Sequence, residues 1–332
     1  MKQPSPLNPF LATALDTVLP LVSPAGKNAR LSVLIYHRVL PTPDPVRAGD
    51  PDAKSFRWQM QLLARHFNVL PLHEAAARLR AGALPARAAC ITFDDGYADN
   101  YTIALPILQE LGLHATFFVA TAYLDGGRMF NDTLIEIAKT LPDGACDLTH
   151  VGLGTHQIAS TVDRCTLLAT LINHFKYLSP EVRIPASDSL AAHFRIPLPS
   201  DLMMTSHQLK ALNAAGMEIG AHTHSHPILS RQHADDAHSE ILLGKERLEA
   251  LLGTRVRLFA YPNGRPTKDY GEEHVAMIPK CGFEAAVSTR PAAADHRSDI
   301  YQLPRFTPWD ATPGRFALRL LRSLLSPHSA GG

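Results

Sequence analysis

Two short stretches of the sequence carry side chains that could bind a metal ion and catalyse hydrolysis. Asp94 and Asp95 follow an apolar run, while His222, His224 and His226 come directly after another apolar run. Neighbouring side chains on an extended backbone point in different directions, so one aspartate can bind a metal while the other faces a substrate. Imidazole is the commonest neutral metal ligand. Together the stretches predict a two-histidine, one-carboxylate site with coordination positions open for water and substrate.

Each stretch also has a plainer interpretation. An Asp-Asp-Gly sequence before a helix-compatible segment is typical of a turn with a helix N-cap. Because the chain has 17 histidines, three of them can gather in a polar loop without binding anything. The combination of the two stretches favours the metal site, since both follow predicted strands.

The apolar runs indicate buried strands that would position these side chains. They lie at 31–36, 88–93, 115–119, 217–220 and 256–260, and helical patterns separate most of them. Near-continuous apolar strands joined by helices are typical of a parallel sheet covered on both faces. Such folds place their chemistry at the carboxyl ends of strands. We therefore expect an α/β fold, either a barrel or a doubly wound sheet, without a phosphate-binding glycine fingerprint.

Composition narrows the class of protein further. The chain has 332 residues, 45% of them apolar, and a net charge of +1, which is ordinary for a globular protein with a sizeable core. The balanced charge and the absence of a long basic block argue against a nucleic-acid partner. Four cysteines occur without C-x-x-C spacing, and we interpret them as small core residues.

The two ends of the chain are expected to lie outside the main domain. We expect a helical extension at 1–30, a single domain at 31–325 with an insertion at about 126–201, and a flexible tail at 326–332. The apolar segment near the N-terminus is interrupted by Asp16 and is too short to span a bilayer, and it lacks the features of a signal peptide. A helix packed on the domain is the expectation, and a membrane-surface helix is the alternative.

Two motifs occur in a characteristic order, Thr92-Phe93-Asp94-Asp95-Gly96 followed by His222-Thr223-x-x-His226. With this pair the sequence resembles the polysaccharide deacetylases of the NodB-homology type, carbohydrate esterase family 4, and especially a branch associated with bacterial exopolysaccharide clusters. The resemblance extends to Tyr36-His37-Arg38-Val39, Ala115-Thr116-Phe117-Phe118, Phe259-Ala260-Tyr261-Pro262-Asn263-Gly264 and Leu303-Pro304-Arg305. The implied fold is a distorted (β/α) barrel with fewer than eight strands.

The resemblance also implies roles for individual residues. Asp95, His222 and His226 would hold one divalent metal ion, with zinc as the first expectation and cobalt, nickel or manganese as alternatives. Asp94 would be the general base, and His224 falls on a variable position. The loop Tyr261-Pro262-Asn263 would contact the substrate, with the backbone N–H of Asn263 stabilising the oxyanion.

The sequence departs from the family pattern at the general acid. The family's histidine ordinarily follows an apolar strand near the C-terminus, whereas here the matching strand is at the start and ends at His37. A circularly permuted barrel, with the last strand moved to the N-terminus, would bring His37 to the site. The alternative is that His37 only closes a strand by hydrogen bonding.

A second departure concerns the arginine that commonly precedes the proline-containing loop. Ala260 occupies that place, and Arg305 is our candidate replacement, because a guanidinium can hold a carboxylate with two hydrogen bonds. An ordinary surface arginine is the competing interpretation. Trp309 could line a sugar-binding groove, or it could belong to the core.

These expectations define a function and its rivals. The first hypothesis is a metal-dependent hydrolase that removes N-acetyl groups from amino sugars of a bacterial exopolysaccharide or its precursor. The rivals are an amide hydrolase acting on a small non-sugar substrate and a catalytically silent carbohydrate-binding module. The expected partner is an N-acetylated carbohydrate, without nucleic acid or a transmembrane segment. We expect a location in the cytoplasm or at the periphery of the inner membrane, and the oligomeric state is open.

Overall fold

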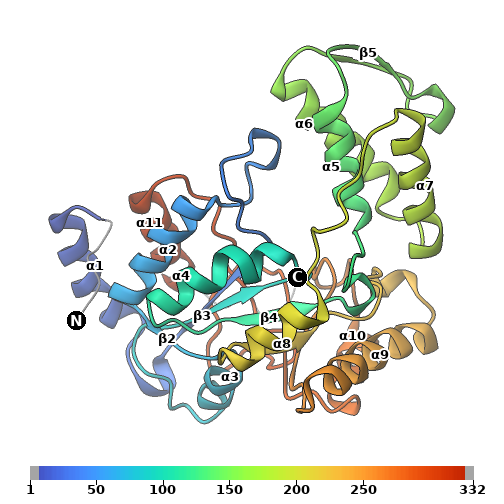
Figure 1. Ribbon diagram of the computed structural model, residues 1–332. Helices are drawn as coiled ribbons and strands as arrows, with labels where there is room; N and C mark the ends of the chain where they lie inside the picture. Colours follow the sequence, from blue (N-terminus) through green and yellow to red (C-terminus); the bar gives the residue numbers. More distant parts are fainter. Residues whose placement is uncertain (1–6, 326–332) are drawn as a thin grey trace.

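Six parallel strands form the framework of the protein in a computed structural model that describes residues 7–325 (Figure 1). Each strand pairs with the next in the spatial order β1, β3, β4, β7, β8 and β9, and the short β2 adds to the start of β3. The strands are β1 Leu31–Tyr36, β2 Asn68–Val69, β3 Ala88–Phe93, β4 Thr116–Val119, β7 Glu218–Ala221, β8 Leu258–Ala260 and β9 Ala285–Val287. The expected α/β fold, a distorted barrel with fewer than eight strands, is confirmed.

A short extended segment fills the gap between the two outer strands. The Leu303 N–H donates to the carbonyl of Ala286 on β9, at 2.9 Å. The Phe306 N–H donates to Val33 on β1 at 2.7 Å, and the Ile35 N–H returns a bond to Phe306 at 3.0 Å. These bonds connect both edges of the sheet through residues 303–306. The N-terminal strand β1 therefore lies between β3 and the segment 303–306, which is the position that a circular permutation requires.

The residues of β1 and β3 are all buried, as their apolar runs predict, and alternate residues enter two hydrophobic clusters. The smaller cluster joins strand residues to residues of α3. The larger cluster joins strand residues to the other helices of the barrel. The helices of the barrel are α2 Ala53–His66, α3 Leu72–Arg80, α4 Leu105–Glu110, α8 Ser206–Ala214, α9 Ala234–Leu252, α10 Glu272–Lys280 and α11 Pro313–Leu325.

Near the N-terminus, α1 (Pro9–Val22) packs against α11. Phe10 and Leu21 on α1 and Leu318 and Leu325 on α11 are exposed. Among residues 7–325, no helix is both long and apolar enough to cross a bilayer. The expected tail at 326–332 lies outside the described residues, and the domain boundaries at 30 and 325 stay predictions.

The segment between β4 and α8 projects from the barrel, at the upper right of Figure 1. It comprises α5 Phe130–Thr140, β5 Gly144–Asp147, β6 Thr155–Ile158, α6 Thr161–Phe175 and α7 Pro180–His193. The last of these helices, α7, contains Pro185. The segment builds its own hydrophobic cluster, and we refer to it below as the insertion.

Close packing of α9 against the histidine loop makes Gly244 a sensitive position. A Cβ atom at Gly244 would lie 2.6 Å from the backbone carbonyl of Thr223, well inside van der Waals contact. Gly244→Ala should therefore destabilise the protein by about 1–3 kcal/mol and reduce metal retention, despite the better helix propensity of alanine. Denaturant unfolding and metal analysis measure the two effects.

Gly314→Ala in α11 is the matched control, because the nearest atom to its added Cβ lies 3.8 Å away. This control should be neutral or slightly stabilising, since alanine is favoured over glycine in helices by about 1 kcal/mol. Equal behaviour of the two variants would show that the contact between α9 and the loop does not constrain the site.

Candidate active site

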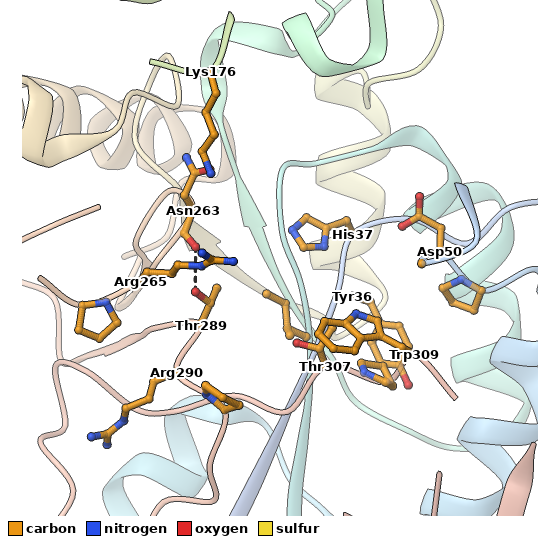
Figure 2. Close-up of a pocket in the computed structure, with 16 residues that line it drawn as sticks. Tyr36, His37, Asp50, Lys176, Asn263, Arg265, Thr289, Arg290, Thr307 and Trp309 are labelled. Carbon is orange, nitrogen blue, oxygen red and sulfur yellow. Dashed lines mark hydrogen bonds between the residues drawn. The ribbon is translucent and has the colours of Figure 1, made fainter. Parts of the chain in front are cut away.

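Two connected cavities open at the carboxyl ends of the strands. The larger, of about 700 Å³, is called the groove here, and its lining includes Tyr36, Arg265 and Trp309 (Figure 2). The smaller, of about 210 Å³, contains the two aspartates and two of the histidines singled out in the sequence, and is called the metal-site cavity. Four residues line both cavities: His37, Lys176, Asn263 and Thr289. A substrate lying in the groove can therefore reach the carboxylates.

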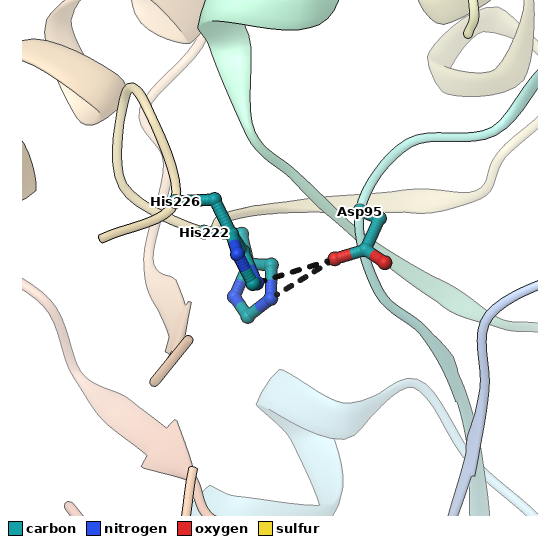
Figure 3. A group of neighbouring side chains, drawn as sticks. All are labelled: Asp95, His222 and His226. Atoms are coloured by element: carbon teal, nitrogen blue, oxygen red, sulfur yellow. Dashed lines mark ion pairs between the residues drawn. The ribbon is translucent and has the colours of Figure 1, made fainter. Parts of the chain in front are cut away.

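Three side chains in the metal-site cavity are placed to share one ion (Figure 3). An Asp95 oxygen lies 3.5 Å from Nε2 of His222 and 3.4 Å from Nε2 of His226. Ligands bound to zinc at about 2.0–2.1 Å in a tetrahedron are about 3.3 Å apart, so this spacing fits a metal. His224 lies outside the group, and its Nδ1 contacts the hydroxyl of Thr121 at 2.9 Å. Asp95, His222 and His226 could thus hold a divalent metal ion, whose identity the geometry leaves open.

The ring orientation of His222 and the protonation states of His226 and Asp95 suit metal binding. His222 Nδ1–H donates to the carbonyl of Ala260 at 2.7 Å, which leaves the lone pair of Nε2 free for an ion. Burial lowers the pKa of His226 to about 3, so this imidazole is neutral at ordinary pH. Burial raises the pKa of Asp95, but its interactions with His222 and His226 lower it by more, so the net pKa lies well below its usual range.

The loop that carries the histidines is held in a strained conformation. His226 and Thr223 have positive φ angles of 56° and 63°, and Asp95 across the cavity has 76°. Non-glycine residues adopt such angles at a cost, and they persist where surrounding contacts enforce them. Here the Glu240 carboxylate on α9 accepts hydrogen bonds from the N–H groups of His224 and Ser225 at 3.0 and 2.7 Å. The contacts with α9 thus fix the direction of the ligands.

Asp94 is held by Arg305 rather than by the ligand group. Both guanidinium nitrogens of Arg305 donate to the two carboxylate oxygens of Asp94, each at 2.7 Å, and Arg305 is 0% exposed. Burial raises the pKa of Asp94, but the positive charge of Arg305 and its hydrogen bonds lower it by more, so the net pKa is below the usual value. Asp94 is consequently a carboxylate that can accept a proton at neutral pH.

His37 lies at the end of β1 and lines both cavities. Its backbone carbonyl accepts a hydrogen bond from the Asn100 side chain at 2.9 Å. The next residue, Arg38, forms an ion pair with Asp99 at 2.6 Å. Two contacts from the segment after Asp95 therefore anchor His37 at the junction of the cavities, with its side chain exposed to solvent.

The loop after β8 divides into a buried part and an exposed part. The side chain of Tyr261 is buried, donates to the carbonyl of Tyr301 at 2.9 Å and stacks on Tyr270. The structure does not bring Tyr261 into either cavity, and Pro262 is also buried outside the two linings. Asn263 lines both cavities and has a positive φ of 58°. Trp309 is 65% exposed and lines the groove instead of the core.

The insertion supplies site residues that sequence reasoning missed. Phe130, Asn131, Ile172, Lys176 and Arg183 line the metal-site cavity. Arg183 on α7 donates to the carbonyl of His226 at 2.7 Å. Their surrounding sequence has no motif and no strand-end position, so only the three-dimensional arrangement identifies them.

The geometry predicts separate effects for the two aspartates. Asp95→Ala should abolish metal retention, because it removes one of three ligands, and His222→Ala should do the same. Asp94→Asn should keep the metal and lose turnover, because its side chain faces Arg305. Metal analysis of the purified variants is the measurement, and an empty site in Asp94→Asn would mean that the two roles are exchanged.

Comparisons with known proteins identify relatives in sequence and in fold. YxkH of Bacillus subtilis (strain 168), a protein named for the polysaccharide deacetylases, is 24% identical over 281 residues, which cover 84% of this chain and 71% of YxkH. Similar folds occur in the Streptococcus pyogenes deacetylase PplD in complex with acetate (TM-score 0.59, 20% identity, covering 90% of this chain and 99% of PplD). IcaB from Ammonifex degensii has a TM-score of 0.57 at 19% identity, covering 92% and 99% of the two chains.

The family model described as polysaccharide deacetylase matches residues 81–165 and 183–286, together more than half of the chain. The matched residues include Asp94, Asp95, His222 and His226, while the interruption falls inside the insertion. The chain therefore belongs to the polysaccharide deacetylase family.

Proposed function

We propose that the protein is a metal-dependent hydrolase that removes N-acetyl groups from amino sugars of a bacterial exopolysaccharide or its precursor. The observation that carries this proposal is the separation of two buried carboxylates. Asp95 faces His222 and His226, while both oxygens of Asp94 bind Arg305 at 2.7 Å. One carboxylate can thus serve a metal and the other a proton transfer. Zinc is the first candidate for the ion.

The residues around the cavity match the steps of amide hydrolysis. A divalent metal bound there would polarise the acetamide carbonyl and lower the pKa of water. Asp94 accepts the proton of the attacking water as a C–O bond forms at the carbonyl carbon. The backbone N–H of Asn263 can donate to the developing oxyanion, a contribution of about 3 kcal/mol at comparable sites. His37 gives a proton to the departing nitrogen as the C–N bond breaks, leaving acetate and a free amine.

The shape of the site favours a glycan over the rival substrates. The groove of about 700 Å³ extends beyond the smaller cavity that holds the aspartates. The exposed Trp309 in its lining can stack on a sugar ring. A small amide would need only the metal-site cavity. A carbohydrate-binding module without catalytic activity would not need Asp95 beside His222 and His226 as a set of three metal ligands. Both features support the deacetylase proposal.

Acetate release tests the proposal directly. The metal-loaded protein should release acetate and free amine from N-acetylated oligosaccharides, faster from longer ones until the groove is filled. Asp94→Asn should lower the rate by about a hundredfold or more, because general-base catalysis typically contributes about 10²–10⁴-fold. Faster release from small N-acetyl amides would favour the small-substrate rival, and no release from any substrate would contradict hydrolysis.

His37→Ala tests the proposed proton donor. It should lower turnover on oligosaccharides by about 10²-fold or more with unchanged metal content, because His37 is not a ligand. The loss should shrink on an N-acetyl anilide, whose weakly basic nitrogen leaves with less need of a proton. Equal losses on both substrates, or unchanged rates, would remove His37 from the reaction.

A further inference from the structure

The groove next to the metal-site cavity carries an excess of positive charge. Its lining includes Lys176, Arg265 and Arg290, whereas Asp50 is its only carboxylate among the described residues. Asp50 is already neutralised by Arg47, with Nε and Oδ2 at 3.2 Å. The chain as a whole has a net charge of only +1, so the excess is local to the groove.

Two of these cations are available to a ligand. In the described part of the chain, neither Lys176 nor Arg265 has a carboxylate within ion-pairing distance. Figure 2 shows Lys176 and Arg265 with Asn263 on one side of the groove, opposite His37 and Trp309. Lys176 follows α6 in the insertion and Arg265 follows β8 in the barrel. Separate parts of the fold therefore bring two positive charges to the same wall.

Another cation, Arg183, lies in the metal-site cavity and is 2% exposed. It lies over the ring of Phe130 at 4.6 Å and donates to the carbonyl of His226, while its Nε has no hydrogen-bond partner among residues 7–325. Buried charges are normally paired with an opposite charge. Arg183 thus adds a positive charge to the metal-site cavity, beside the carboxylates of Asp94 and Asp95.

A neutral N-acetylated sugar offers hydroxyl and amide groups, which require hydrogen-bond partners but no cations. We propose that the substrate is an anionic glycan, with a carboxylate or phosphate group within about one sugar of the N-acetyl group, and that Lys176 and Arg265 bind this group. Guanidinium and ammonium groups suit both oxyanions. The inference rests on the proposed deacetylase function for the identity of the sugar. The binding of an anion by Lys176 and Arg265 follows from the position of these two residues in the groove and does not depend on that function.

Binding by calorimetry to the full-length protein tests the inference without requiring turnover. The probes are three N-acetylated oligosaccharides of equal length: a neutral one, one with alternating uronic acids, and one with a terminal phosphate. At least one anionic probe should bind about tenfold or more tightly than the neutral probe, because hydrogen bonds to charged groups contribute more than those between neutral groups. The preference should fall as salt is added. The tighter of the two anionic probes identifies the source of the charge.

Variants test whether Lys176 and Arg265 cause the preference for anionic probes. Lys176→Gln with Arg265→Gln should reduce the ratio of anionic to neutral affinity by about tenfold to a hundredfold. Lys210→Gln with Arg80→Gln, two exposed cations outside both cavities, removes the same charge and should leave the ratio unchanged. Equal affinity for all probes, or an equal effect of both double variants, would overturn the inference. Selective binding without acetate release would support it while refuting the proposed activity.

Discussion

The buried ion pair between Arg305 and Asp94 is the interaction on which the site depends. Arg305 reaches Asp94 because the segment 303–306 bonds to both β9 and β1, and its Nε also donates to the carbonyl of Ser288 at 2.9 Å. Removing one partner of a buried ion pair typically costs about 3–5 kcal/mol. The pair therefore links closure of the barrel to the orientation of the Asp94 carboxylate. Asp95, with its positive φ of 76°, is turned toward the histidines instead.

The sequence predicts the framework well, because the signals are local. Apolar runs identify the strands, and polar residues at their carboxyl ends identify Asp94, Asp95 and the histidine loop. Arg305 could be proposed only because this sequence lacks the arginine of the family pattern, since Arg305 and Asp94 are more than two hundred positions apart. Tyr261 shows that a role taken from a family motif can be wrong for an individual residue. It belongs to the expected motif, yet its hydroxyl bonds to Tyr301 and its ring stacks in the core.

The insertion is the least predictable part and has the largest effect on the shape of the site. Its own hydrophobic cluster stabilises helices that contain no catalytic motif, and α7 accommodates Pro185 within the helix. From these helices Arg183 reaches the histidine loop, and Lys176 follows α6 at the border of the two cavities. The barrel thus supplies Asp94, Asp95, His222 and His226, whereas the insertion supplies much of the lining of the metal-site cavity. The family model covers these four residues, and its match is interrupted within the insertion.

The central claim is that a metal held by Asp95, His222 and His226 makes Asp94 an effective base for deacetylation. The most direct measurement starts from chelator-treated protein, adds zinc in steps, and records bound metal and acetate release on the same samples. Acetate release should rise in proportion to bound zinc and saturate at one ion per chain. Full activity without metal, or no acetate release at one ion per chain on any N-acetylated glycan, would contradict the account.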